Sequence, residues 1–276
     1  MLDSLGAVII ARTNIPQTLL SDETTNNIFG ISDSYPSASH PDAPTLRTLN
    51  PHNLSLTPAG SSGGEGALLA MKGALIGFGT DLGGSIRKPA AFCGLYSLRP
   101  TSRRLPYAGA SNVFEGAEAL ESVCGPMGGS WRALEVAMSA LVGARPWQVD
   151  PKCVPITWVA DEEREKKELD GQTERKCFGV MRWDGLVRPH PPIERGMDEA
   201  VAGLRAAGHE VIEWEALDHA GAQEIVSKIF DSDGGEDVRR LLGNAGEPLM
   251  PQTFTSQHPA MGVWESWQVS RRRLTF

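Results

Sequence analysis

The sequence predicts an α/β fold in which a mixed, mostly parallel β-sheet is surrounded by helices. Three observations predict it: an apolar run near the N-terminus has the composition of a buried strand, an almost uncharged helical run lies between two glycine-rich segments, and residues 178–214 follow a strand–helix–strand pattern. Strands joined through a helix usually pair in parallel within one sheet. The alternation therefore indicates the α/β class.

The first element is the run GAVIIA at residues 6–11, which is followed by polar Arg12, Thr13 and Asn14. Its shortness and β-branched content predict a buried strand. Residues 31–46 are dense in Ser, Pro and Asp and follow no period. We expect a long loop there.

Two glycine-rich segments each carry a serine, Ser61 in residues 60–66 and Ser85 in residues 80–87. Between them, residues 65–76 predict a buried helix that begins at the first segment, and residues 78–87 predict a loop that returns past this helix. The two serines would then face each other. Glycine lets backbone N–H groups approach a ligand closely, so the pattern predicts a serine active site with donors for a developing negative charge.

The second half of the chain continues the alternation. Residues 131–143 predict a helix, 178–183 a strand, 193–207 a helix with apolar residues at helical spacing, and 210–214 another strand. The charge run at 161–167 is more typical of a solvated helix face or a linker than of a binding site.

The composition is that of a globular protein, and its charge favours a small-molecule ligand. Of 276 residues, 41% are hydrophobic, and 26 Lys and Arg against 34 Asp and Glu give a net charge of −8. The pI is near 5.3, and no basic stripe is interleaved with aromatic residues, so we expect no nucleic-acid partner. The run at 6–11 is too short for a signal sequence or a membrane span. We expect no membrane partner and a cytoplasmic location.

Other reactive side chains give weaker signals. The cysteines form no CxxC pair and have no histidine at metal-ligand spacing, so we expect reduced core thiols, no metal and no cofactor. The histidines lie mostly in apparent loops, which does not favour a histidine base. Glu65 stands at a helix N-terminus, where a carboxylate more simply stabilises the helix dipole than acts as a base. The cysteines are Cys93, Cys124, Cys153 and Cys177.

Three rival motifs fit less well. GxxxxGK[ST] is absent, and the nearest GxGxxG frame has Leu82 in place of its third glycine, which argues against a phosphate cradle. Residues 60–64 spell GxSxG, but Pro58 interrupts the strand that such an elbow needs. Residues 85–88 spell SxxK, but Pro89 disfavours the helical geometry that motif requires.

Residues 60–66 and 79–89 resemble the signature of the amidase signature family, which hydrolyses amides with a Ser–Ser–Lys triad. Similarity to its acetamidase-type branch covers most of the chain outside 31–46. The resemblance implies the family's α/β fold, a small-molecule amide substrate and no cofactor. The further similar segments are residues 5–17, 92–107, 125–127, 150–155, 187–192 and 234–237.

By this resemblance, Ser85 corresponds to the nucleophile and Ser61 to the bridging serine, which the family holds after a cis peptide bond. Asp81 and Arg87 correspond to structural supports of the turn. In the family mechanism, a neutral lysine takes a proton from the bridging serine, which takes one from the nucleophile, and water hydrolyses the acyl-enzyme. The oxyanion hole would consist of the backbone N–H groups of Leu82, Gly83, Gly84 and Ser85.

The chain also departs from the family. The family lysine lies farther upstream of the bridging serine than the 60 residues that precede Ser61 here, so we expect this chain to lack it. Arg12 cannot act as a neutral base. Ala59 stands where relatives usually have glycine, which matters if this position needs a positive φ. Because family members are longer, the resemblance implies one partial domain over residues 1–276, truncated at both ends, with its signature core at 50–107.

Three hypotheses for function remain open. The first is an amide hydrolase by descent that has little or no activity as this chain, because the base is missing. The alternative is a noncatalytic homologue that binds a partner, or an erroneous gene model in which residues 31–46 are a retained intron, and transcript sequencing distinguishes these. The third is a substitute base, for which Lys88 is better placed than Lys72 because it lies three residues from Ser85.

Overall fold

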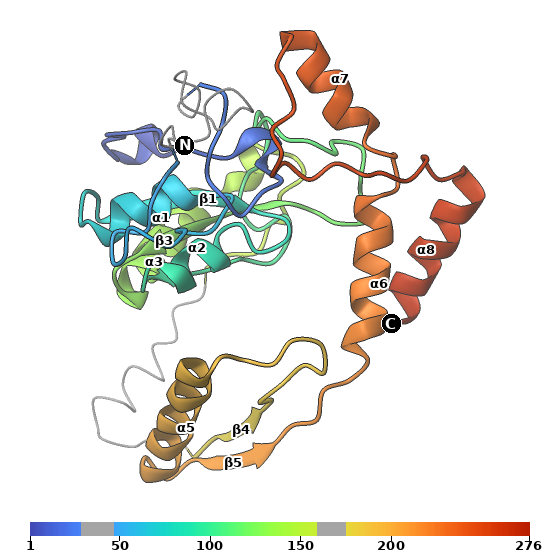
Figure 1. The fold of residues 1–276 in the computed structure, drawn as a ribbon. Coiled ribbons are helices and arrows are strands. Elements are labelled where there is room, and N and C mark those ends of the chain that lie inside the picture. The colour runs from blue at the N-terminus through green and yellow to red at the C-terminus, as the bar shows by residue number, and fades with distance from the viewer. Residues whose placement is uncertain (29–46, 159–174) are drawn as a thin grey trace. The chain divides into compact units, whose positions relative to one another are not determined.

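The computed structural model describes residues 1–28, 47–158 and 175–276 (Figure 1). The chain divides into two compact units, one of residues 1–158 and 233–261 and the other of residues 159–232 and 262–276. The single partial domain expected from the sequence stays a prediction. The expected loop at 31–46 and the charge run at 161–167 lie outside the described residues.

A three-stranded antiparallel sheet organises the first unit. It consists of β1 (Ile76–Asp81), β2 (Tyr96–Ser97) and β3 (Val123–Gly128) in the order β1-β3-β2. β1 pairs with β3 along its whole length. The α/β class is confirmed, but among the described strands only the β4–β5 pair of the second unit is parallel. The expectation of a mostly parallel sheet was wrong for the sheet next to the two serines.

Helices pack on this sheet, as the cyan-to-green part of Figure 1 shows. α1 (Gly63–Ala70) contacts β1 and α2 (Arg87–Phe92), and α3 (Trp131–Gly143) contacts β3. The predicted helix at 131–143 is confirmed, and Ser130 caps it by accepting from the Ala133 N–H at 3.2 Å. One core cluster joins α1, α2, β3 and the turn after β1 through Leu69, Ala90, Met127 and Ile86.

The helix between the serine segments is shorter than the sequence predicted. α1 ends at Ala70 because Lys72 adopts a left-handed conformation with φ of 59°. The N–H groups of Lys72 and Gly73 donate to the carbonyls of Leu69 and Leu68, both at 2.9 Å, which closes the helix end in a Schellman arrangement.

The loop predicted from residue 78 was wrong, since residues 76–81 form β1. Gly77 and Gly79 argued against a strand. They are required because α1 packs close to the strand: a Cβ at Gly77 would collide with the Glu65 carboxylate, and one at Gly79 would collide with the Ser62 side chain.

The buried strand predicted at residues 6–11 was also wrong. These residues form no strand, and Val8, Ile9 and Ile10 are 84%, 63% and 63% exposed. An apolar run becomes a buried strand only when a neighbouring strand satisfies its backbone groups, and the described part of the chain places no strand beside this run. The composition of the run therefore did not predict its environment.

The second unit contains the predicted strand–helix–strand motif. β4 (Cys177–Val180) and β5 (Glu210–Glu213) pair in parallel, and α5 (Pro191–Ala206) connects them. Two prolines begin α5, where their missing N–H groups cost nothing. In the same unit α6 (His219–Phe230) contacts α8 (Val263–Thr275), and Glu224 is ion-paired with Arg272 at 3.0 Å.

The short elements η1 (Asp3–Leu5), η2 (Gln17–Leu19) and η3 (Pro146–Gln148), together with α7 (Glu236–Ala245), complete the first unit. No helix among the described residues has the length and apolar character that crossing a bilayer requires.

All four cysteines are free thiols, but the core location expected for them was wrong for Cys177, which is exposed. Burial raises the pKa of Cys124 to about 11.

Candidate active site

The Ser61 turn directly precedes α1 and has an unusual backbone. The Gly60–Ser61 peptide bond is cis, as the family resemblance implied, and Ala59 has φ of 63°. Ser61 is only 2% exposed. The buried hydroxyl of Thr24 donates to the Ala59 carbonyl at 3.0 Å, which fixes the peptide group between Ala59 and Gly60.

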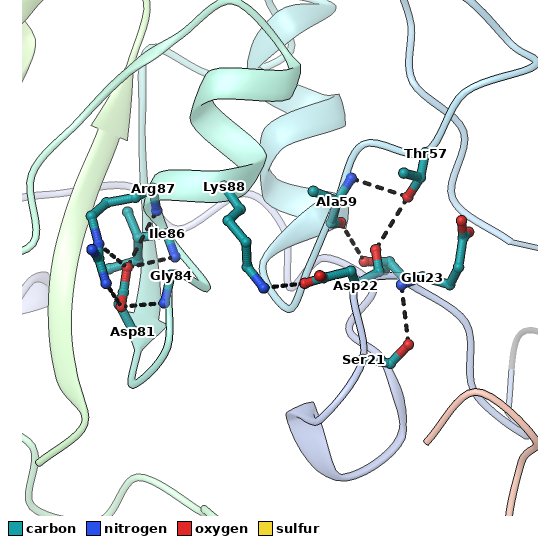
Figure 2. A network of polar contacts seen from close by, with 11 residues as sticks. Ser21, Asp22, Glu23, Thr57, Ala59, Asp81, Gly84, Ile86, Arg87 and Lys88 are labelled. Atoms are coloured by element: carbon teal, nitrogen blue, oxygen red, sulfur yellow. Dashed lines mark hydrogen bonds and ion pairs between the residues drawn. The ribbon is translucent and has the colours of Figure 1, made fainter. Parts of the chain in front are cut away.

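The Ser85 turn follows β1 and is built around the Asp81 carboxylate, which is fully buried (Figure 2). Asp81 accepts from the N–H groups of Gly84 and Ile86 at 2.8 and 3.1 Å. It also accepts from the Arg87 guanidinium at 2.9 and 3.0 Å and lies 3.5 Å from the Arg99 Nε. These bonds wrap residues 82–87 around one carboxylate and leave Ser85 half-buried.

Charge and hydrogen bonding set the ionisation of Asp81. Burial by itself would raise the pKa of this carboxyl, but the hydrogen bonds from Arg87, Gly84 and Ile86 outweigh it. The pKa of Asp81 is therefore below its ordinary value, and the same pair raises the pKa of Arg87. The turn is held by an ionised carboxylate.

The two serine turns meet. The N–H of Ser62 donates to the carbonyl oxygen of Ser85 at 3.1 Å, so the residue after Ser61 is bonded directly to Ser85. Gly79 permits this approach because a side chain there would displace Ser62. The structure thus brings together the turns that hold the two serines that the sequence singled out.

Of the four N–H groups expected to form an oxyanion hole, one is already engaged. The Gly84 N–H donates to Asp81 Oδ1. Within residues 1–28, 47–158 and 175–276, no hydrogen bond is found from the N–H groups of Leu82, Gly83 or Ser85. These three groups have the freedom that an oxyanion donor needs.

Lys88, the sequence's candidate for a substitute base, extends across the Ser85 turn to Asp22, and the two side chains form an ion pair (Figure 2). An ammonium group paired with a carboxylate carries no free electron pair for a proton. Lys72 lies beyond the opposite end of α1 from Ser61 and is exposed. Neither lysine is arranged as a base for Ser61.

Glu65 lies in the first turn of α1, and its side chain points toward β1. It accepts from the Thr13 hydroxyl at 2.7 Å and from the Phe78 backbone, while burial raises its pKa. Its contacts join α1 to β1 and to residue 13. The sequence predicted only that Glu65 stabilises the helix dipole, and it did not predict these two contacts.

Several contacts at this site left no signal in the sequence. Asp22, Thr24 and Thr57 lie outside the two glycine-rich segments, and Arg99 lies 18 residues beyond Asp81. Each contributes through a contact that only the fold creates, so no local pattern could have found them. The exception is Asp81, which the family resemblance already identified as a structural support of the turn.

A cavity of about 460 Å³ lies elsewhere in the first unit, lined by Asp233, Gly234, Glu236, Arg239 and residues 256–260. Its charged groups already have partners: Asp233 accepts from the Gly235 and Asp237 N–H groups, and Arg239 donates to the Gly234 carbonyl and Glu236. None of the serine-turn residues lines it.

No group of three or more His, Cys, Asp or Glu side chains that could hold a metal ion is found in the described part of the chain.

Comparison with known proteins gives the family. The family model described as Amidase matches residues 1–276. The chain is 40% identical to the acetamidase of Aspergillus oryzae over 261 residues, which cover 94% of this chain and 44% of the acetamidase. It is 39% identical to the acetamidase of Emericella nidulans over 281 residues, covering 100% of this chain and 48% of that protein. The chain thus spans about half the length of the curated relatives it matches.

Solved structures agree with the sequence comparison. The fold matches a fatty acid amide hydrolase with a TM-score of 0.81 at 32% identity, covering 96% of this chain and 43% of that one. A bacterial aryl acylamidase shares the fold with a TM-score of 0.67 at 21% identity, covering 99% of this chain and 52% of the acylamidase.

Proposed function

Because the chain belongs to the amidase family, we propose that its serine site cleaves amide bonds of small molecules by acyl transfer to Ser85. The observation that carries this proposal is the 3.1 Å hydrogen bond from the Ser62 N–H to the Ser85 carbonyl, which joins the turn that holds Ser61 to the turn that holds Ser85. Unengaged N–H groups on the Ser85 turn add the donors that acyl transfer requires.

In the proposed reaction, Ser85 Oγ attacks the amide carbonyl carbon, its proton passes to Ser61 Oγ, and the proton of Ser61 passes to a base. The carbonyl oxygen becomes an oxyanion and accepts from the N–H groups of Leu82, Gly83 and Ser85. Gly84 joins them only if its N–H leaves Asp81. As the C–N bond breaks, Ser61 donates a proton to the departing amine, and water then cleaves the ester to release the acid and restore Ser85.

We assign the base to neither of the two lysines that the sequence offered as substitutes. Lys88 is ion-paired with Asp22, and Lys72 lies at the far end of α1. A missing positioned base costs about 10²–10⁴ in rate. We therefore propose that a polypeptide of these 276 residues acylates Ser85 slowly by itself. A cytoplasmic location and the absence of a nucleic-acid partner stay predictions.

Labelling with a fluorophosphonate tests the nucleophile without requiring turnover. We expect the 276-residue polypeptide to label at Ser85, as located by mass spectrometry, and Ser85→Ala to abolish labelling. Ser55→Ala is the matched control, since Ser55 lies in an exposed loop of the same unit and should label like the wild type. A wild-type chain with no label above the Ser85→Ala background would favour the noncatalytic homologue instead.

Hydrolysis is then measured on short aliphatic and aryl amides by release of the amine. We expect a slow rate that depends on Ser85. Turnover that persists in Ser85→Ala would show that the serine turns are not the site of the reaction.

A further inference from the structure

Residues 21–24, which we call the strap, provide a second connection between the two serine turns. The strap is attached first to the Ser61 turn. The Thr57 hydroxyl donates to the Asp22 carbonyl at 3.1 Å, and the Thr24 hydroxyl donates to the Ala59 carbonyl at 3.0 Å. Gly60 packs so closely on the strap that a Cβ there would lie 3.1 Å from the Asp22 Cα.

The strap is attached to the Ser85 turn through Lys88. The Lys88 N–H donates to the Gly84 carbonyl at 2.7 Å, and its aliphatic stem covers Gly84, where a Cβ would lie 3.0 Å from both Cγ and Cε. The ammonium group ends at Asp22 Oδ1, as Figure 2 shows. The side chain therefore runs from the nucleophile's turn to the strap.

The two serine turns are thus joined twice. The Ser62 N–H to Ser85 carbonyl bond joins them directly, and the Asp22–Lys88 ion pair joins them through the strap. Proton transfer between Ser85 and Ser61 depends on their separation, and a misplacement of about 1 Å costs on the order of 100-fold in rate. A connection that limits this separation acts on the reaction without touching the substrate.

We propose that Asp22 and Lys88 are positioning residues whose ion pair holds the Ser61 turn against the Ser85 turn. This inference rests on the proposed function, because it concerns the reaction of Ser85. It also accounts for Lys88 in a position where the sequence pointed to a base: its charge engages the strap rather than the proton of Ser61.

The test separates the charge of Lys88 from its bulk. Lys88→Met keeps an unbranched stem over Gly84 and removes the ammonium, whereas Lys88→Arg keeps the charge. We expect Lys88→Met and Asp22→Asn each to lower the second-order rate of fluorophosphonate labelling about tenfold, within the loss expected for a small misplacement. Lys88→Arg should retain most of the wild-type rate.

Salt and hydrogen exchange supply readouts that a change in overall stability would not produce. In about 1 M NaCl, where the screening length is about 3 Å, wild-type labelling should fall toward that of Lys88→Met, and Lys88→Met itself should be unaffected. Amide exchange in residues 58–64 and 82–86 should accelerate in Lys88→Met and not in Lys88→Arg, while peptides from α3 exchange as before.

The outcomes distinguish this inference from the function on which it rests. Wild-type labelling that Lys88→Met leaves unchanged, with unchanged exchange in both turns, overturns the positioning role and leaves the proposed function standing. A wild type that does not label refutes the proposed function. In that case, exchange that responds to Lys88→Met and not to Lys88→Arg still supports an ion pair that holds the two turns together.

Discussion

At the scale of single residues, Asp81 accepts most of the hydrogen bonds that hold the conformation of the Ser85 turn. Its carboxylate is fully buried, yet it accepts from backbone N–H groups and from Arg87. A buried charge is tolerated when hydrogen bonds compensate for its lost hydration. The neutral isostere Asn has one acceptor oxygen and one amide group, so it cannot replace both carboxylate oxygens.

We expect Asp81→Asn to destabilise the protein by about 2–4 kcal/mol, because asparagine cannot accept all the hydrogen bonds from Gly84, Ile86 and Arg87, and each buried donor left without a partner costs about 1–3 kcal/mol. The charge of Arg87 adds little to this loss, since its side chain is 53% exposed and solvent screens it. Urea denaturation measures the change. Asp184→Asn is the control: Asp184 also accepts two backbone N–H bonds, but it is only half-buried and water can replace those bonds, so the stability loss should be clearly smaller than for Asp81→Asn.

The same comparison has a pH dependence with a definite sign. The folded pKa of Asp81 is lowered, so its contribution is fully present above the unfolded value near 3.8 and is lost as the pH falls through the lower folded value. The stability difference between wild type and Asp81→Asn should be constant from about pH 5 to 7 and shrink below about pH 4. A difference that grows on acidification would contradict the assigned ion pair.

Ala59 shows how opposing effects make an unexpected residue tolerable. The sequence raised the question whether position 59 needs a positive φ, and its φ of 63° shows that it does. A non-glycine residue in this region costs about 1–2 kcal/mol. Glycine would remove that cost but lose a buried methyl group of about 0.8 kcal/mol and roughly 0.5–1 kcal/mol of backbone entropy. The terms nearly cancel, so alanine stands there at little net cost.

At the scale of elements, the contact between α1 and β1 depends on a missing side chain. A Cβ at Gly79 would collide with Ser62 Oγ and lie 3.0 Å from the Ser62 Cβ and 3.2 Å from Ile86 Cγ1. Ser62 and Ile86 belong to the two serine turns. A methyl group at position 79 would therefore push the turns apart.

We expect Gly79→Ala to lower stability by about 1–3 kcal/mol, the usual cost of overpacking a core, and to slow fluorophosphonate labelling more than its stability loss explains. Gly203→Ala provides the contrast. Gly203 lies inside α5 with nothing within 4 Å of its Cβ position, so alanine should stabilise that helix by about 0.5–1 kcal/mol. Thermal and urea denaturation measure both, and a neutral Gly79→Ala would show that α1 can shift without loss.

The elements also show what the sequence could predict. α3 and the β4–α5–β5 unit were predictable because their apolar residues repeat at the element's own period and their ends carry ordinary caps or prolines. β1 was not predictable, because glycine is a poor strand former. Glycine is required in this strand only because α1 packs closely against it. Local pattern reflects an element's own preferences, whereas β1 depends on a tertiary contact.

The site divides along the same line. Ser61, Ser85 and Asp81 were found from the glycine spacing and the family resemblance, because these features are contiguous in sequence. The sequence did not predict that the Gly84 N–H donates to Asp81 or that Lys88 pairs with Asp22. Both contacts depend on side-chain orientations that are set by the tertiary fold. Asp22 lies 66 positions before Lys88, with no motif to connect them.

At the scale of the whole molecule, apolar side chains lie exposed on a chain that spans about half the length of its relatives. The densest run is Val8, Ile9 and Ile10, at 84%, 63% and 63% exposure, in an uncharged stretch without a partner strand among the described residues. Exposed segments that are apolar, β-branched and uncharged are the usual sites of association between chains. The 276-residue polypeptide by itself should therefore associate with other copies through this run.

We expect Ile9→Lys to raise the concentration at which the 276-residue polypeptide self-associates by about tenfold, because burial of one isoleucine contributes roughly 1.5–3 kcal/mol and a tenfold change needs only about 1.4 kcal/mol. Light scattering coupled to size-exclusion chromatography over a concentration series measures it. Leu217→Lys is the matched control, since Leu217 is 73% exposed but stands outside the run and adds the same charge. An equal effect of the two variants would assign the change to net charge, and residues 6–11 would then have no special part in association.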